Sequence, residues 1–102
     1  MDDITSKELH QRLSNGEKLN IIDVREEWEF EEKNIGAVLI PLDSLPDRLS
    51  EIDNFKEQEL IIHCKSGARS GRAKQFLETQ GYTKVRNLLG GILGYLEQET
   101  QS

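Results

Sequence analysis

One cysteine, Cys64, is the residue of this 102-residue chain best suited to nucleophilic chemistry. It lies in the stretch 60-LIIHCKSGARSGRAKQFL-77, where an apolar run ends, two glycines follow and a helical pattern begins. A tight loop of this kind can point successive backbone N–H groups at one spot, and the helix that follows adds the positive end of its dipole. Both effects favour a thiolate over a thiol, so we predict that the pKa of Cys64 is depressed.

The charges around this cysteine suit a small anion. Residues 60–77 contain four basic residues and no acidic one, whereas residues 1–59 contain 16 acids and 7 bases. The net charge of −6 argues against a general nucleic-acid binder, which needs a broad basic surface. Within this acidic chain we expect Lys65 and Arg69 to attract an anionic substrate to the loop.

Other side chains of the loop and of an earlier strand would complete the site. Gly67 fits a backbone position with positive φ, and the hydroxyls of Ser66 and Ser70 can donate hydrogen bonds. Asp23 and Arg25 end an earlier apolar run, and the carboxyl ends of parallel strands share one edge of a sheet. We expect these two residues to support the site, with Asp23 accepting hydrogen bonds from loop backbone or pairing with an arginine.

Three further residues have simpler interpretations. His63 ends an apolar run and is interpreted as a packed histidine, because a thiolate of low pKa needs no general base. Trp28 and Phe30 belong to the short acidic helix expected over 26-EEWEFEEK-33. We expect both aromatic side chains to pack in the core or at its edge.

Helical and strand patterns alternate along the chain with short connections. This alternation predicts the α/β class, with a mostly parallel sheet and helices on both faces. The length suits one domain over residues 1–102 with a core of about 4–97. Pro46 is expected to kink or delay the helix in which it lies. The expected strands are 19–24, 37–41, 60–63 and 83–88, and the expected helices run from Thr5 to Asn15 and over 26–33, 42–52, 70–80 and 92–99.

The composition limits the kind of protein further. Apolar stretches such as 37-AVLI-40 are only a few residues long, whereas a bilayer-spanning helix needs about 20. The opening MDDITSKELH is acidic and has no apolar signal region, so we expect a cytoplasmic location and no membrane association. A lone cysteine can form neither an internal disulfide nor a multi-thiolate metal site. We therefore expect no bound metal.

Four segments, in this order along the chain, resemble the rhodanese-like (sulfurtransferase) domain family. The loop 64-CKSGARS-70, preceded by LIIH and followed by a helix, is similar to the active-site loop of that family. The segments 20-NIIDVREEWEF-30, 35-IGAVLIPL-42 and 81-GYTKVRNLLGGILGY-95 resemble its "DVR", "GA-x-N-IP" and "GY-x-x-V-x-x-L-x-GG" segments. The similarity extends over nearly the whole chain and implies a single rhodanese-like domain.

This resemblance implies a sulfurtransferase in which Cys64 attacks a sulfane sulfur donor such as thiosulfate and carries the sulfur as a persulfide. The acceptor would be cyanide, a small thiol, or a protein thiol such as thioredoxin or a sulfur-carrier protein. Loop amides would hold the persulfide anion, so the reaction would need no metal and no organic cofactor. The donor would be bound by the loop residues Lys65, Ser66, Gly67, Ala68 and Arg69, with Ser70 in support.

One segment departs from the family pattern. Many members carry "G-H-I-x-G-A" where this chain has Lys33-Asn34-Ile35-Gly36-Ala37, which is one residue tighter and lacks the histidine. We expect this segment to shape the edge of the site and so to affect the choice of acceptor.

Three alternatives to sulfur transfer stay open. Cys-dependent phosphatases, and arsenate reductases like them, use a Cys-x5-Arg loop, but here Arg69 gives Cys-x4-Arg and Ser70 takes their arginine position. The shorter loop should suit a sulfur atom better than a phosphate. A non-catalytic or regulatory binding module of the same fold would be expected to lack the cysteine. A redox-sensing thiol could form only an intermolecular disulfide, because the chain has no second cysteine.

Overall fold

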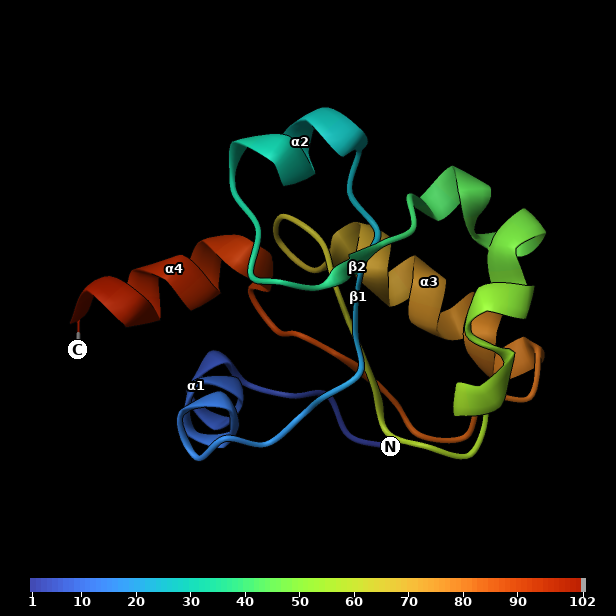
Figure 1. Ribbon diagram of the computed structural model, residues 1–102, viewed down its shortest axis with the longest axis horizontal. Helices are drawn as coiled ribbons and strands as arrows, with labels where there is room; N and C mark the ends of the chain where they lie inside the picture. Colours follow the sequence, from blue (N-terminus) through green and yellow to red (C-terminus); the bar gives the residue numbers. More distant parts are fainter. Residues whose placement is uncertain (102) are drawn as a thin grey trace.

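Four parallel strands form the centre of the structure, a computed structural model that describes residues 1–101, and side chains through residue 98. The strand order is β2-β1-β3-β4, and each neighbouring pair is parallel. Figure 1 shows the helices arranged around this centre. The predicted α/β class with a mostly parallel sheet is confirmed. The strands are β1 (Ile21–Asp23), β2 (Val38–Leu39), β3 (Leu60–His63) and β4 (Val85–Asn87), and the helices are α1 (Ser6–Ser14), α2 (Glu27–Glu32), α3 (Ala68–Thr79) and α4 (Gly91–Gln101), with the 3-10 segments η1 (Leu42–Glu51) and η2 (Asp53–Phe55).

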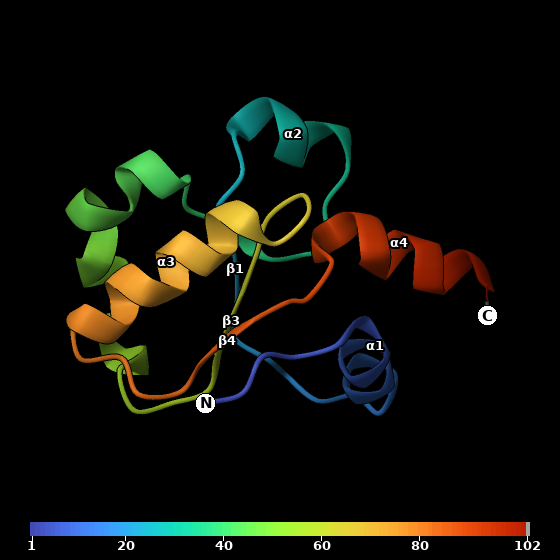
Figure 2. The same cartoon turned by 180° about the vertical axis from the view of Figure 1, so that it is seen from behind.

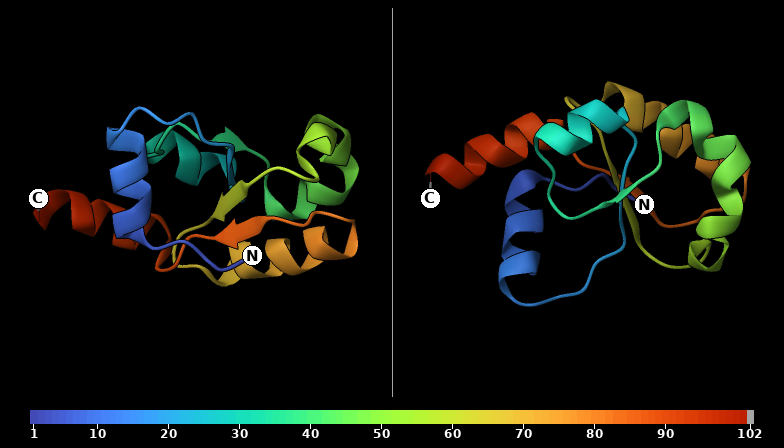
Figure 3. Two further views of the ribbon diagram at one scale, coloured as in Figure 1. Left: turned by 90° about the horizontal axis from the view of Figure 1, so that it is seen from below. Right: turned by 45° about the horizontal axis from the view of Figure 1, so that its top comes forward.

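The sheet carries an apolar layer on each face, because successive residues of a strand point to opposite sides. Ile22 and Ile62, which pair across β1 and β3, belong to a cluster that also contains residues of α3 and η1. Their neighbours Ile21 and Ile61, also a pair, belong to a second cluster with residues of α1 and α4. The helices accordingly lie on both sides of the sheet (Figure 3).

The carboxyl ends of the strands meet at one edge of the sheet, since all the strands run in the same direction. At that edge lie α2 and the loop between β3 and α3. Figures 1 and 2, seen from opposite sides, both place this loop between α2 and the first turn of α4. The fold thus brings two segments that are far apart in the sequence, α2 and the first turn of α4, around the residues that follow β3.

Most element boundaries fall close to the expected ones. The first helix begins after Thr5, whose hydroxyl oxygen caps α1 by accepting a hydrogen bond from the backbone N–H of Glu8 at 3.1 Å. The helix expected over 70–80 begins two residues earlier, at Ala68. Within residues 1–101, no helix combines the length and the apolar character needed to span a membrane.

The helix expected over 42–52 is a 3-10 segment, η1, rather than an α-helix. Pro46 lies inside it, and Arg48 departs from helical geometry with φ −116° and ψ 15°. A proline has no N–H to donate to an α-helical ladder and crowds the preceding turn, so the chain winds more tightly and breaks. Leu45 is nevertheless buried in the core, so the segment still packs against the sheet.

The expected packing of Trp28 is wrong: its side chain is 63% exposed. Phe30 is half-buried, and the buried residue of α2 is Glu29. The reason is the position of α2 at the end of the sheet, where the inward face of the helix meets a charged loop rather than an apolar layer.

A matched pair of leucines tests the position of the core. Leu77 of α3 is fully buried and Leu93 of α4 is 51% exposed. Leu77→Ala should lower the free energy of unfolding by about 3 kcal/mol, because it leaves a cavity. Leu93→Ala should change it by less than about 0.5 kcal/mol. Urea denaturation followed by circular dichroism measures both, and equal losses in the two variants would contradict the structure.

Candidate active site

The loop from Cys64 to Gly67 connects β3 to α3 and is shaped by a glycine. Gly67 is the residue before the helix and has φ 111° and ψ −12°, in the left-handed region that glycine adopts without strain. Its carbonyl accepts a hydrogen bond from the side-chain amide of Asn87 at 3.1 Å. The sequence-based expectation of positive φ at this position is confirmed.

The sulfur of Cys64 accepts several hydrogen bonds from this loop and from the first turn of α3. The backbone N–H of Gly67 lies 3.1 Å from Sγ, and the hydroxyl of Ser70 lies 3.3 Å from it. Burial raises the pKa of Cys64. Hydrogen bonds from the Ser70 side chain and from the backbones of Ser70, Gly67 and Ser66 outweigh burial, so the pKa lies below its ordinary value. The predicted direction is confirmed, and these hydrogen bonds are its cause.

Ser70 is buried and stands between two acceptors. Its hydroxyl lies 3.3 Å from the sulfur and 2.5 Å from Oδ1 of Asn87. A hydroxyl has only one proton to donate, so it serves one acceptor at a time. A thiolate is the stronger acceptor and draws the proton to sulfur, whereas a neutral thiol leaves it with Asn87. Ser70 can therefore adjust to the charge of Cys64.

Asn87 is a residue of the site that the sequence analysis missed. It is the last residue of β4, and its two side-chain groups bind Ser70 and the carbonyl of Gly67. Its position at the carboxyl end of a strand beside β3 is a signal that could have identified it.

The first turn of α4 holds the other side of the loop. The backbone N–H of Ile92 donates to the carbonyl of Cys64 at 2.9 Å, and that of Leu93 donates to the carbonyl of Lys65 at 3.2 Å. Gly91, just before them, has φ 60°, and a Cβ there would collide with the Lys65 carbonyl. The helix can approach the loop this closely only because the residue is glycine.

The side chain of Arg69 binds Glu29 of α2 rather than the sulfur of Cys64. Its two terminal nitrogens lie 2.7 and 2.9 Å from the two carboxylate oxygens of Glu29. The hydrogen bond from Arg69 lowers the pKa of Glu29 to about 2, and one Glu29 oxygen also accepts the backbone N–H of Glu26 at 3.0 Å. The Cys64 thiolate is among the charges that raise the pKa of Arg69, after Glu29. Glu29 is a second residue missed from the sequence, where nothing distinguished it from the other glutamates of α2.

Asp23 and Arg25 form a buried pair with each other. Oδ2 of Asp23 lies 2.8 Å from Nη2 of Arg25, and Oδ1 accepts the Arg25 backbone N–H at 3.0 Å. Arg25 also donates to the carbonyl of Lys33 at 2.7 Å, which fixes the end of α2 against the sheet. The expected pairing of Asp23 with an arginine is therefore found, and the pair acts on the site by holding α2.

His63 is fully buried, as a packed histidine should be. Burial lowers its pKa, so the ring is neutral at pH 7. Its Nε2 lies 3.6 Å from the Asp23 carboxylate, and its Nδ1 lies 3.3 Å from the carbonyl of Cys64. Both ring nitrogens thus lie against oxygen atoms, which agrees with the interpretation that this residue is not the base for Cys64.

Access to the sulfur is narrow. Cys64 is only 1% exposed, whereas Lys65, Ser66 and Ala68 of the loop are exposed.

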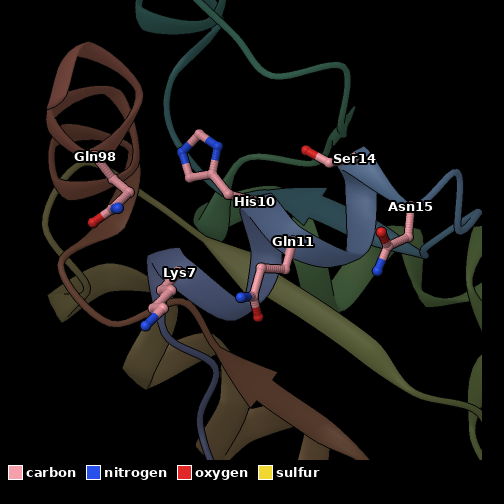
Figure 4. Close-up of a pocket in the computed structure, with 6 residues that line it drawn as sticks. All are labelled: Lys7, His10, Gln11, Ser14, Asn15 and Gln98. Atoms are coloured by element: carbon pink, nitrogen blue, oxygen red, sulfur yellow. The ribbon is translucent and has the colours of Figure 1, made fainter. Parts of the chain in front are cut away.

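Two hollows lie on the surface beside α4. One of about 190 Å³ lies between α2 and α4 and borders Lys65. The other, about 630 Å³, lies between α1 and α4 and is lined by Lys7, His10, Gln11, Ser14, Asn15 and Gln98 (Figure 4). The larger hollow does not include Cys64. In the described part of the chain, no group of three or more His, Cys, Asp or Glu side chains is placed to hold a metal ion.

A parallel α/β domain with a cysteine loop at the carboxyl end of a strand is the arrangement of a rhodanese domain, and comparison with known proteins agrees. The family model for the rhodanese-like domain matches residues 5–98, so the chain belongs to the rhodanese-like domain family, as its sequence suggested.

Named relatives extend this result. The chain is 38% identical to a sulfurtransferase of Allochromatium vinosum, and the match covers 93% of this chain and 88% of that relative. It is 35% identical to the thiosulfate sulfurtransferase PspE of Escherichia coli, and this match covers 70% of this chain and 68% of PspE. It is 28% identical to the structure of the human single-domain sulfurtransferase TSTD1, with a TM-score of 0.81 over 94% of this chain and 96% of that one. Other curated relatives are longer, and the chain spans 48% and 59% of two of them. The relatives support rhodanese-type sulfur transfer in general.

The charge state of Cys64 can be measured by its alkylation rate against pH. The pH at which the rate is half-maximal should lie below about 8.5, the pKa of an ordinary cysteine, because the thiolate is stabilised. Ser70→Ala should move the midpoint upward, since it removes a donor to the sulfur. Ser66→Ala is the matched control: it keeps the backbone N–H and should leave the midpoint unchanged. A midpoint at the ordinary value in the unmodified protein would contradict the hydrogen-bond argument.

The close approach of α4 to the loop can be tested with glycine variants. Gly91→Ala should displace the loop, because the new methyl group collides with the Lys65 carbonyl, and the alkylation rate of Cys64 at neutral pH should change at least about tenfold. Gly81→Ala is the control. Gly81 also has positive φ, at 94°, but no atom lies within 4 Å of the added carbon. If both variants alkylate like the unmodified protein, α4 does not position the loop.

Proposed function

We propose that this protein is a thiosulfate or persulfide sulfurtransferase that works through a persulfide on Cys64. The observation that supports it best is the set of hydrogen bonds to Sγ from the Gly67 N–H and the Ser70 hydroxyl. The groups that stabilise a thiolate there are also suited to stabilise a persulfide anion. The relatives named as sulfurtransferases support the same chemistry.

The first half-reaction loads sulfur onto the enzyme. The Cys64 thiolate attacks the outer sulfur of thiosulfate, an S–S bond forms to Sγ, and the S–S bond of thiosulfate breaks. Sulfite leaves with the electron pair of that bond, so no proton transfer is needed.

The second half-reaction returns the enzyme to its thiolate form. A thiolate or cyanide attacks the outer sulfur of the persulfide and breaks its bond to Sγ, and the products are a new persulfide or thiocyanate. The acceptor could be a small thiol or a protein thiol, such as thioredoxin or a sulfur-carrier protein. No step requires a metal or an organic cofactor, and the cytoplasmic location stays a prediction of the sequence.

The loop residues have different roles in this proposal. Ser66, Gly67 and Ser70 stabilise the charged sulfur, and the exposed Lys65 and Ala68 border the entrance. Arg69 contributes a positive charge close to Cys64, but the bidentate pair with Glu29 offsets that charge. We therefore assign the attraction of the anionic donor mainly to Lys65 and the holding of the loop mainly to Arg69.

Phosphate transfer fits the site less well. Ser70 occupies the position at which a Cys-x5-Arg phosphatase would place its arginine, and it is buried against the sulfur. The nearby arginine, Arg69, is already bound to a carboxylate. Neither residue is placed to close around a tetrahedral oxyanion.

Mass spectrometry of the intact protein tests the proposal directly. Incubation with thiosulfate should add the mass of one sulfur atom, and cyanide should remove it with release of thiocyanate. Cys64→Ser should not gain the mass, because serine is not a sulfur nucleophile. No added mass, or equal addition to the variant, would show that Cys64 does not carry sulfur. Turnover of an aryl phosphate that is lost in Cys64→Ser would favour the phosphatase alternative.

A further inference from the structure

The side-chain amide of Asn87 lies next to the hydroxyl group that faces the nucleophile. Oγ of Ser70 lies 2.5 Å from Oδ1 of Asn87 and 3.3 Å from Sγ of Cys64. Ser70 and Asn87 are both buried, so bulk water is not a ready substitute for either acceptor. The hydroxyl therefore chooses between an amide oxygen and a sulfur atom.

The orientation of the Asn87 amide is fixed at its other end. Its Nδ2 donates to the carbonyl of Gly67 at 3.1 Å, and a carbonyl oxygen can only accept. The amide oxygen must therefore face Ser70, where it accepts and cannot donate. The backbone is held as well, because the Asn87 N–H donates to the carboxylate of Asp3 at 3.0 Å. Asn87 is thus a fixed acceptor beside the Ser70 hydroxyl.

The distances and the charge of the sulfur decide where the hydroxyl proton lies. The contact between Ser70 and Asn87 is at the short end of the range for O–H···O hydrogen bonds, so Asn87 competes well with an uncharged sulfur. Hydrogen bonds to a charged acceptor are roughly twice as strong as those between neutral groups. A thiolate at Cys64 therefore draws the same proton away from Asn87.

We propose that Asn87 is a positioning residue, which holds the Ser70 proton away from Sγ while that atom is uncharged and releases it when Sγ becomes an anion. The inference rests on the proposed function for its place in the reaction. In the persulfide the charge lies on the outer sulfur, so the Ser70 hydroxyl donates to Asn87. When an acceptor takes the outer sulfur, the bond to Sγ breaks, its electron pair stays on Sγ, and the hydroxyl turns to the new thiolate. The proton stays on the serine oxygen throughout.

This competition has the opposite effect on Cys64 from simple support of the loop. If Asn87 competes for the proton, its removal leaves the sulfur as the remaining acceptor, so the pKa of Cys64 falls. If Asn87 only supported the loop, its removal would loosen the donors and the pKa would rise. The Gly67 carbonyl keeps a partner in either case, because it also accepts the backbone N–H of Gly71 at 3.0 Å.

The charged groups around the site are unaffected by a change at Asn87, which is itself neutral. The first turn of α4, 91-GILG-94, carries no charge. A shift in the titration of Cys64 in an uncharged variant of Asn87 therefore reports on hydrogen bonds. The groups on the other surrounding elements are the pairs Asp23 with Arg25, Glu29 with Arg69 and Asp3 with Lys74, the exposed Lys65, and His63, whose pKa is lowered by burial.

The rate of alkylation by iodoacetamide against pH tests the inference without any sulfur transfer. Asn87→Leu has a similar shape, lacks the acceptor and leaves little room for water. Its midpoint should fall by at least about half a pH unit. Its limiting rate at high pH should fall about 1.5- to 3-fold, because a thiolate of lower pKa is a weaker nucleophile. Asn20→Leu is the matched control, since Asn20 lies at the opposite end of the sheet, where its amide donates to the Glu59 carbonyl.

The same substitution in a Ser70→Ala background shows whether the effect passes through the hydroxyl. There Asn87→Leu should leave the midpoint unchanged, because no proton is left to compete for. Asn87→Val is smaller, suits a strand and also lacks the acceptor, so it gives the same comparison if leucine disturbs folding. A midpoint that rises or stays constant in these variants, or one that falls equally without the Ser70 hydroxyl, would overturn the inference.

Release of thiocyanate from protein preloaded with thiosulfate places the effect in the reaction. Cyanide should remove sulfur from Asn87→Leu about 1.5- to 3-fold faster than from the unmodified protein, because a thiol of lower pKa leaves faster. Slower or equal release would contradict the assigned role in transfer. If thiosulfate adds no sulfur to Cys64 at all, the proposed function is wrong, and the alkylation profiles still decide whether Asn87 controls the Ser70 proton.

Discussion

Hydrogen bonds to one sulfur atom are the interaction on which the rest of this site depends. Burial of Cys64 raises its pKa, and the hydrogen bonds from Ser66, Gly67 and Ser70 lower it by more, so that the pKa lies below its ordinary value. Backbone N–H groups suit this purpose because they are fixed by the conformation of the loop and cannot titrate. The stabilisation of the thiolate therefore depends on the positions of a few peptide N–H groups. The surrounding structure has to hold those groups in place.

The edge of the sheet supplies that rigidity from three directions. Asn87 at the end of β4 binds both Ser70 and the Gly67 carbonyl, the first turn of α4 binds the carbonyls of Cys64 and Lys65, and Glu29 of α2 binds Arg69. α2 itself is held by Arg25, which is paired with buried Asp23. Loss of one partner from a buried ion pair is costly, on the order of 3–5 kcal/mol, because the other charge stays behind. The pair therefore makes displacement of α2, and with it of Arg69, unfavourable.

The parts of the fold that depend on local pattern were predictable from the sequence. The alternating helices and strands, the Thr5 cap, positive φ at Gly67 and the depressed pKa of Cys64 each follow from a few neighbouring residues. The parts that failed depend on distant contacts. Trp28 is an apolar residue of the kind usually found in a core. Because α2 lies past the end of the sheet, no apolar layer covers the Trp28 side chain. Glu29 is one glutamate among several until Arg69, 40 positions later, comes within 2.7 Å.

The spacing of residues in the loop also predicts the chemistry better than their types do. An arginine five positions after the cysteine could, by type alone, bind an oxyanion. In the fold, the helix that begins at Ala68 directs Arg69 to Glu29 and turns Ser70 toward the sulfur. The site is thus left with neutral donors at the nucleophile and a charge that is already paired. Neutral donors can stabilise a single charged sulfur without binding it so strongly that it cannot leave, which is the requirement for an intermediate that has to be passed on.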